Sequence, residues 1–235
     1  MNNRIKAFVS FPVKRYGRFV YSTVLLFLVP CLLSGGASSG VMQKKTNHVL
    51  AQYESTYALL QETLHRNPED IVSRMDMARL YITVAEELSQ PAEKRVFWAM
   101  ADREASIALN LKPDDKKARH LYAETAILTD NLARAMRIYE DLVYEDRKGS
   151  NTEDPAVLFG IYILEQKIDR GILFFRTKLR QDPNRHDVQY LLALIHLMAG
   201  DQRDAAAYLR DLADDPSTPK NILFISQKLL MEIDR

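Results

Sequence analysis

Apolar residues between positions 186 and 216 recur with helical spacing in two runs that a short turn separates. The turn is Ala199-Gly200-Asp201, and a glycine followed by a polar residue is typical of one helix ending and the next beginning. Small residues, Ala193 and Ala205, stand where the helices would touch. Larger residues fill the rest of this contact: Leu192, His196, Leu209 and Leu212. The pattern predicts a helical hairpin that is apolar on more than one face and therefore needs a similar hairpin on each side.

Further helical segments precede this hairpin. In residues 41–66 the apolar positions are three or four apart: Val49, Tyr53, Tyr57, Leu60 and Leu64. Turns that stop one helix and start the next recur at Pro68, Pro113 and Pro183. The two intervals are 45 and 70 residues, close to one and two units of a repeat of about 34 residues. The chain is therefore predicted to consist of repeated helical pairs.

The repeated units resemble tetratricopeptide repeats. Each helical pair of that family has a small residue at its eighth and twentieth positions, a large one at the twenty-fourth and a proline near the thirty-second. The matching positions in successive units are Ala78, Ala101, Ala108 and Pro113; Ala123, Ala135 and Tyr139; Gly160 and Gly171; and Ala193, Ala205 and Leu209. The match covers roughly residues 45–216, and four units in register make it specific.

The resemblance implies an all-α fold, a right-handed α-solenoid of helical hairpins. The solenoid would occupy residues 41–235 and follow a signal or anchor segment at 1–40. Its expected units are residues 41–70, 71–115, 116–149, 153–185 and 186–216, with a capping helix at 219–235.

One hairpin departs from the repeat length. Ala78 and Ala101 are 23 residues apart rather than twelve, so eleven residues are inserted between them. Helical periodicity continues on both sides of Ser89, which is a candidate N-cap, and Pro91 suits a first helical turn. Both helices are therefore predicted to be longer by about five residues, or ~8 Å. The single tryptophan, Trp98, would lie near the tip of this hairpin, either packed on its first helix or contacting a partner.

Two other stretches are irregular. Residues 146–154 have the Gly, Ser, Asn and Asp content of a surface loop. Residues 221–235 predict a last helix that covers the end of the solenoid. The apolar arc of this helix is wider than capping requires, which makes Phe224 a candidate for a further contact.

The N-terminus has the pattern of an exported protein. Residues 1–40 contain five basic residues and no acidic ones, residues 19–33 are almost entirely apolar, and small residues follow at 34–40. This is typical of a secretory signal, although residues 19–33 would also serve as an uncleaved membrane anchor. Either alternative places the remainder on the periplasmic side of an inner membrane, because basic residues stay in the cytoplasm.

Charge and cysteine content limit the classes of partner and of chemistry that are expected for the chain. The chain has 32 Lys and Arg residues, and 27 remain beyond residue 40 against 31 Asp and Glu. This slightly acidic body argues against nucleic acid, which selects a basic face. The only cysteine, Cys31, lies in the apolar run, so the folded body contains no thiol.

Residue patterns typical of an enzyme are absent from the sequence. No two histidines have a spacing that would bring two metal ligands together on one helical turn: His48, His65, His120, His186 and His196. His196 takes an apolar position of the repeat and is predicted to be a core histidine. There is neither a phosphate-binding glycine loop nor a nucleophile elbow. We expect no catalytic residue, no cofactor and no metal.

The resemblance implies a partner-binding groove lined by the first helix of each unit. The corresponding positions here are Met75, Arg79, Ile82, His120, Glu124, Ile127, Tyr190 and Leu194. A mixed apolar groove that contains Arg79 and Glu124, of opposite charge, suits an amphipathic protein segment. The carboxylate-binding Lys/Asn clamp of some family members is not matched, because Arg79, Glu124 and Leu194 occupy its places.

These features favour a non-enzymatic scaffold for protein–protein interaction. It would face the periplasm and assist the assembly of an envelope complex of the pilus, secretion or cytochrome-maturation type. The alternative is a structural platform that forms homo-oligomers through the last helix or the lengthened hairpin. An enzyme would need a site between repeats, which the sequence does not indicate.

Overall fold

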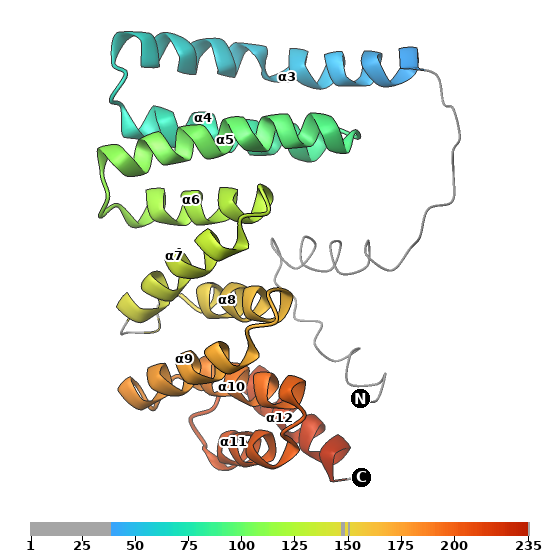
Figure 1. Ribbon diagram of the computed structural model, residues 1–235, viewed down its shortest axis with the longest axis vertical. Helices are drawn as coiled ribbons and strands as arrows, with labels where there is room; N and C mark the ends of the chain where they lie inside the picture. Colours follow the sequence, from blue (N-terminus) through green and yellow to red (C-terminus); the bar gives the residue numbers. More distant parts are fainter. Residues whose placement is uncertain (1–38, 147–148, 150, 235) are drawn as a thin grey trace. The chain divides into compact units, whose positions relative to one another are not determined.

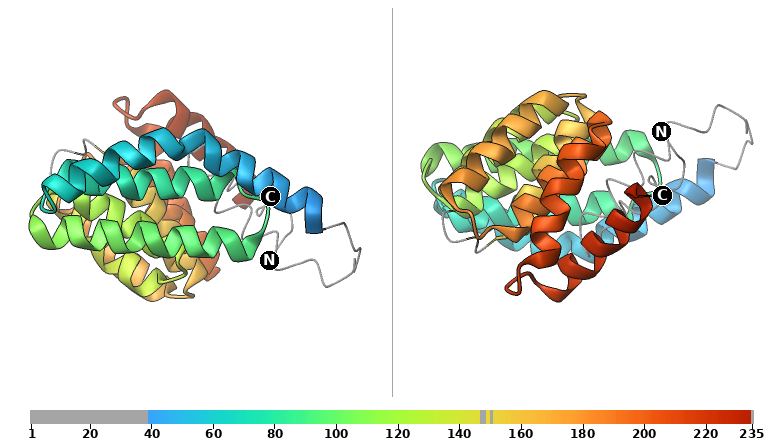
Figure 2. Two further views of the ribbon diagram at one scale, coloured as in Figure 1. Left: turned by 90° about the horizontal axis from the view of Figure 1, so that it is seen from above. Right: turned by 90° about the horizontal axis from the view of Figure 1, so that it is seen from below.

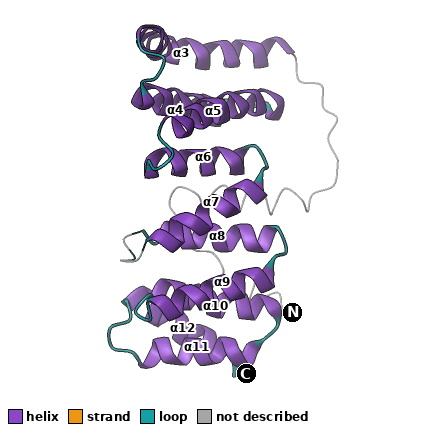
Figure 3. Cartoon of the chain, turned by 60° about the vertical axis from the view of Figure 1, so that its left-hand side comes forward, coloured by secondary structure: helices purple, strands orange, loops and turns teal. Residues whose placement is uncertain are grey.

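The computed structural model describes residues 39–146, 149 and 151–234. Within these residues the secondary structure is helical throughout, without any strand (Figures 1 and 3). The helices are α3 (Ser39–Arg66), α4 (Ile71–Glu87), α5 (Pro91–Leu111), α6 (Lys116–Leu128), α7 (Leu132–Glu145), α8 (Glu153–Leu164), α9 (Ile168–Gln181), α10 (His186–Ala199), α11 (Gln202–Asp214) and α12 (Lys220–Ile233). The apolar core of the predicted signal or anchor, residues 19–33, lies outside the described residues. Among the helices that are described, none is long and apolar enough to cross a membrane.

The described chain divides into two compact units. Residues 39–138 form the N-terminal unit, and residues 139–234 form the C-terminal unit, so that the boundary falls within α7. In the N-terminal unit each of the helices α3 to α6 contacts the next one, and α4 also contacts α6. In the C-terminal unit the same holds from α8 to α12, and α10 contacts both α8 and α12. The predicted all-α fold of stacked helical hairpins is confirmed within each unit. Its right-handed path stays a prediction.

The lengthened hairpin is present in the N-terminal unit. Helix α4 has 17 residues and α5 has 21, whereas α6 has 13. The 28-residue helix α3 runs beside this hairpin (Figures 1 and 2). Aromatic rings join the three helices: the Tyr81 ring centre lies 6.3 Å from that of Tyr57 and 6.1 Å from that of Phe97. The Tyr53 hydroxyl donates a hydrogen bond to Glu87. The inserted residues therefore extend packed helices rather than a loop.

Helix starts in the N-terminal unit follow local side-chain chemistry. Asp70 caps α4 by accepting a hydrogen bond from the backbone N–H of Ser73 at 3.1 Å, and Asp115 caps α6 in the same manner. Pro91 occupies the first turn of α5, as predicted. The prediction of Ser89 as the N-cap of α5 is wrong, since Gln90 holds that position and its side chain does not cap the helix. A proline in the first turn leaves one backbone N–H fewer to satisfy.

Close packing in the C-terminal unit depends on small residues. Ala193 and Ala205 are fully buried, and Gly171 is also buried. A Cβ atom on Gly171 of α9 would lie 2.3 Å from Ile195 Cδ1 of α10 and 2.9 Å from Tyr162 Cδ2 of α8, so any larger residue would force these side chains to shift. The eighth and twentieth positions are thus contact points between helices, as the repeat pattern indicates.

The predicted loop at 146–154 is shorter than expected. Helix α8 begins at Glu153, and Asp154 is buried in its first turn. Acidic residues are favourable at a helix N-terminus, which explains why two residues assigned to the loop are helical. At the other end of the loop, the buried Lys178 ammonium donates to the carbonyl oxygens of Tyr144 and Asp146, both at 3.1 Å. This cation satisfies carbonyl groups at the C-terminus of α7.

Candidate functional site

The predicted groove residues of α4 differ in exposure. Arg79 keeps half of its side chain exposed and forms an ion pair with Asp76 on the same helix, with 2.9 Å between Nη1 and Oδ1. Met75 and Ile82 are buried in the core of the N-terminal unit. Of these three residues, Arg79 is exposed to solvent, whereas Met75 and Ile82 pack in the core beneath α4.

The predicted residues of α6 are closer to the surface. His120, Glu124 and Ile127 are each half-buried, and α6 contacts α4 directly. The two helices therefore carry four predicted residues that retain exposed area: Arg79, His120, Glu124 and Ile127. We call these four residues the α4–α6 surface. It combines an aliphatic side chain, an imidazole and two opposite charges.

The predicted groove residues of the C-terminal unit lie in its interior. Tyr190 and Leu194 of α10 are buried, as is every residue from Tyr190 to Leu197. Burial raises the pKa of the Tyr190 phenol, because an apolar environment disfavours the charged form. These side chains pack against the neighbouring helices, and a contact between them and a partner stays a prediction.

An ionic cluster in the N-terminal unit was not predicted from the sequence. Arg134 of α7 pairs with Asp102 of α5, with 3.2 Å between Nη1 and Oδ2. The same guanidinium donates to the Tyr122 hydroxyl at 3.0 Å, and the Thr125 hydroxyl donates to Asp102 at 2.8 Å. Both charged side chains are more than three-quarters buried. The cluster ties three successive helices together.

The C-terminal unit contains a second cluster of this kind. Arg170 of α9 donates to both carboxylate oxygens of Glu140 on α7, at 2.8 and 2.6 Å, and the Tyr162 hydroxyl of α8 donates to the same carboxylate at 2.6 Å. Burial and the bond to Glu140 raise the pKa of Tyr162. Arg134 precedes Ala135 and Arg170 precedes Gly171, so both arginines occupy the same place in the repeat. That shared place is the sequence signal for these clusters.

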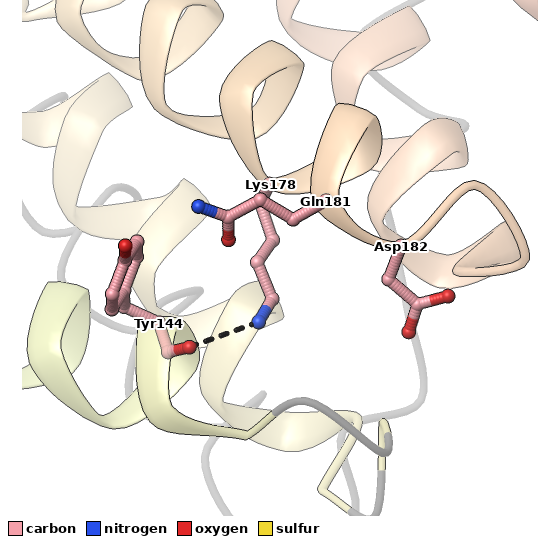
Figure 4. Close-up of a pocket in the computed structure, with 4 residues that line it drawn as sticks. All are labelled: Tyr144, Lys178, Gln181 and Asp182. Atoms are coloured by element: carbon pink, nitrogen blue, oxygen red, sulfur yellow. Dashed lines mark hydrogen bonds between the residues drawn. The ribbon is translucent and has the colours of Figure 1, made fainter.

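A pocket of about 290 Å³ opens in the C-terminal unit between the ends of α7 and α9. Tyr144, Lys178, Gln181 and Asp182 line it (Figure 4). The Lys178 ammonium would be its most reactive group, but it is 2% exposed and binds backbone carbonyls. A lysine held in this way has a structural role, because its N–H donors are engaged by backbone carbonyl groups.

Serine, histidine and aspartate meet at the start of α10 without forming a hydrolytic triad. His186 Nε2 lies 2.9 Å from Asp215 Oδ2 and 3.3 Å from Ser217 Oγ. In a triad, the serine and the carboxylate contact opposite ring nitrogens, whereas here both contact the same one. Ser217 and His186 lower the pKa of Asp215 to about 2. The contacts among His186, Asp215 and Ser217 hold the turn after α11 against the start of α10.

His196 is a core histidine, as predicted. Its ring is 3% exposed, lies 5.7 Å from the Tyr208 ring centre, and places Nδ1 3.2 Å from Asp201 Oδ2. Ligand atoms of His196, Asp201 and Asp204 lie within 4.8 Å of one another, a spacing that a metal ion could span. The Asp201 carboxylate, however, already caps α11 by accepting from the backbone N–H of Asp204. This cap accounts for the cluster.

The two predicted secondary contacts differ. Trp98 is half-buried on α5, seven residues after the helix begins. Phe224 is 66% exposed on α12. Of the two, Phe224 offers the larger free apolar surface.

Two solved structures of MamA share the fold of this chain at low sequence identity. One crystal structure of MamA aligns over 80% of this chain and 92% of its own, with 10% identity and a TM-score of 0.52. MamA from Desulfovibrio magneticus RS-1 aligns over 82% and 97%, with 13% identity and a TM-score of 0.50. A tetratricopeptide repeat protein from Parabacteroides merdae aligns over 92% and 77%, with 16% identity and a TM-score of 0.41. Neither a protein-family model nor a curated protein matches the sequence.

Proposed function

Because the chain has a tetratricopeptide-repeat-like fold, we propose that it is a non-enzymatic scaffold that holds another protein. The partner offers an amphipathic segment, and the α4–α6 surface binds it. The scaffold faces the periplasm and assists the assembly of an envelope complex.

The observation that carries this proposal is the composition of the α4–α6 surface. Arg79 and Glu124 carry opposite charges on two helices that contact each other, and Ile127 adds an aliphatic side chain. An amphipathic helix can place its apolar residues on Ile127 and charged residues of both signs on Arg79 and Glu124. Opposite charges on one binding surface select the orientation and identity of a partner more than they add affinity. The corresponding residues of α10, Tyr190 and Leu194, are buried.

The partner is best identified by photo-cross-linking from position 127 in the native host. With the purified partner, the double charge reversal Arg79→Glu with Glu124→Arg should weaken binding by roughly tenfold, or about 1.4 kcal/mol. Each reversed charge then has the same sign as the partner's charge that faces it, and the two repel each other. The buried core of the fold is not changed. Isothermal titration calorimetry measures the affinity, and far-ultraviolet circular dichroism checks the helix content.

A matched control is Arg137→Glu on α7, which reverses one exposed charge of the same unit. Its affinity should equal that of the original chain. If the double reversal also leaves the affinity unchanged, the α4–α6 surface is not the binding site.

The periplasmic location rests on residues 1–40 and has its own test. Protease added to spheroplasts should digest the full chain, whereas intact cells should protect it. A chain that starts at residue 41 should be protected in both, because it lacks the basic and apolar segments that direct export. The mass of the mature protein distinguishes signal cleavage from an uncleaved anchor. Protection of the full chain in spheroplasts would contradict export.

A further inference from the structure

One face of α12 is exposed along the whole helix. Residues on this face follow one another at intervals of three or four: Asn221, Phe224, Gln227 and Met231, with Asp234 just beyond the helix end. The opposite face, with Ile222, Ser226 and Leu229, is buried. Helix α12 contacts α10 and α11 and is the last helix of the C-terminal unit (Figure 1).

The exposed face is apolar where two residues stand one heptad apart. Phe224 is 66% exposed and Met231 is 59% exposed. Seven residues correspond to about two helical turns, so both side chains point to the same side. Their spacing is that of successive core positions in a two-helix coiled coil. Single exposed apolar residues are common, but two in this register form a stripe that fits another helix.

This stripe is complementary to itself in the antiparallel direction. If two copies of α12 pair around a twofold axis near Gln227 and Lys228, Phe224 of each copy meets Met231 of the other. An aromatic ring in contact with a thioether is favourable. The same register brings Lys220, exposed at the start of the helix, close to Asp234 of the second copy, which lies 3.4 Å from Arg210 of its own chain and stays 62% exposed. The charges at the two ends of the helix are thus opposite in sign.

We propose that the chain forms a homodimer through antiparallel pairing of α12, with Phe224 and Met231 as the central contacts. A second copy fits better than an unrelated apolar segment, because twofold pairing covers the apolar stripe and places opposite charges together at both ends of the contact. One helix pair buries less surface than an obligate dimer does, so the dimer dissociates on dilution. The inference is independent of partner binding by the α4–α6 surface.

The mass of the full chain in mild detergent, measured by sedimentation at several concentrations, tests the proposal. The original chain should pass from monomer to dimer as its concentration rises. Phe224→Glu should raise the dimer dissociation constant at least tenfold, because it puts a charge in the apolar contact. Leu173→Glu is the matched control: Leu173 is 65% exposed on α9, so its loss should leave dimerisation unchanged. Equal masses for all three chains at every concentration would overturn the proposal.

Disulfide trapping tests the register directly. In a Cys31→Ser background, a mixture of Phe224→Cys and Met231→Cys chains should give a mixed disulfide in preference to either symmetric one. The antiparallel register places residues 224 and 231 of the two copies face to face, whereas two residues 224 lie about 10 Å apart along the helix axis. That separation exceeds the reach of a disulfide, about 7 Å between Cα atoms. Symmetric disulfides as the main product would refute the antiparallel pairing.

Discussion

Replacing Asp102 with alanine is expected to lower the free energy of unfolding of the N-terminal unit by about 2–3 kcal/mol. The change leaves the Arg134 guanidinium, which is 18% exposed, without its carboxylate. The Thr125 hydroxyl, which is fully buried, also loses an acceptor. Trp98 is the only tryptophan and lies one helical turn before Asp102, so its fluorescence during urea denaturation reports on this unit.

The control for this prediction is the exposed ion pair on the preceding helix. Asp76→Ala breaks the ion pair with Arg79, in which the Asp76 side chain is 47% exposed and the Arg79 side chain is 50% exposed. This change should alter the unfolding free energy by no more than about 0.5 kcal/mol. If Asp102→Ala and Asp76→Ala have the same small effect, the Arg134 cluster does not stabilise the contacts between its three helices.

Replacing Gly171 with alanine is expected to destabilise the C-terminal unit by about 2 kcal/mol, although alanine normally favours a helix over glycine by about 1 kcal/mol. The added Cβ atom would overlap Ile195 Cδ1 and the Tyr162 ring, both of which are fully buried. At least one of these buried side chains would have to shift to admit the new atom. Far-ultraviolet circular dichroism during urea denaturation measures the effect, since the only tryptophan belongs to the other unit.

A double-mutant cycle shows whether the overlap causes this loss. Ile195→Val removes the Cδ1 atom that the new Cβ atom would meet, and alone should cost about 1 kcal/mol. Combined with Gly171→Ala, it should restore about 1 kcal/mol relative to the sum of the two changes. Strict additivity would mean that Gly171 is not required for close packing of α9 against α8 and α10.

Much of the fold can be predicted from the sequence because each helical repeat has a characteristic spacing of small and large residues. The small residues at Ala123, Ala135, Ala193 and Ala205 mark contacts between helices, and all four are fully buried. The interval between Ala78 and Ala101 correctly indicates the longer helices of that hairpin. Both features are intervals within a single helical hairpin, so they can be read from the spacing of residues along the chain.

The candidate site is harder to predict because exposure depends on neighbouring repeats. Met75 and Tyr190 occupy groove positions of the repeat, yet other helices cover them. The ionic clusters were missed for a similar reason: Asp102 and Arg134 are 32 residues apart in the chain. Only the register of arginine beside a small residue, shared by Arg134 and Arg170, indicates them in advance. The start of α8 was misassigned because acidic residues are common both in loops and in first helical turns.

The aromatic contacts that run from α3 through α4 to α5 imply that these helices are matched in length. Tyr53 and Tyr57 of α3 reach Glu87 and Tyr81 of the extended hairpin. Excising the eleven inserted residues alone would uncover apolar surface on α3, and shortening α3 alone would uncover the hairpin. A variant with a hairpin of ordinary repeat length would therefore also need a shorter α3, so the lengths of α3 and of the hairpin are expected to change together in evolution or design.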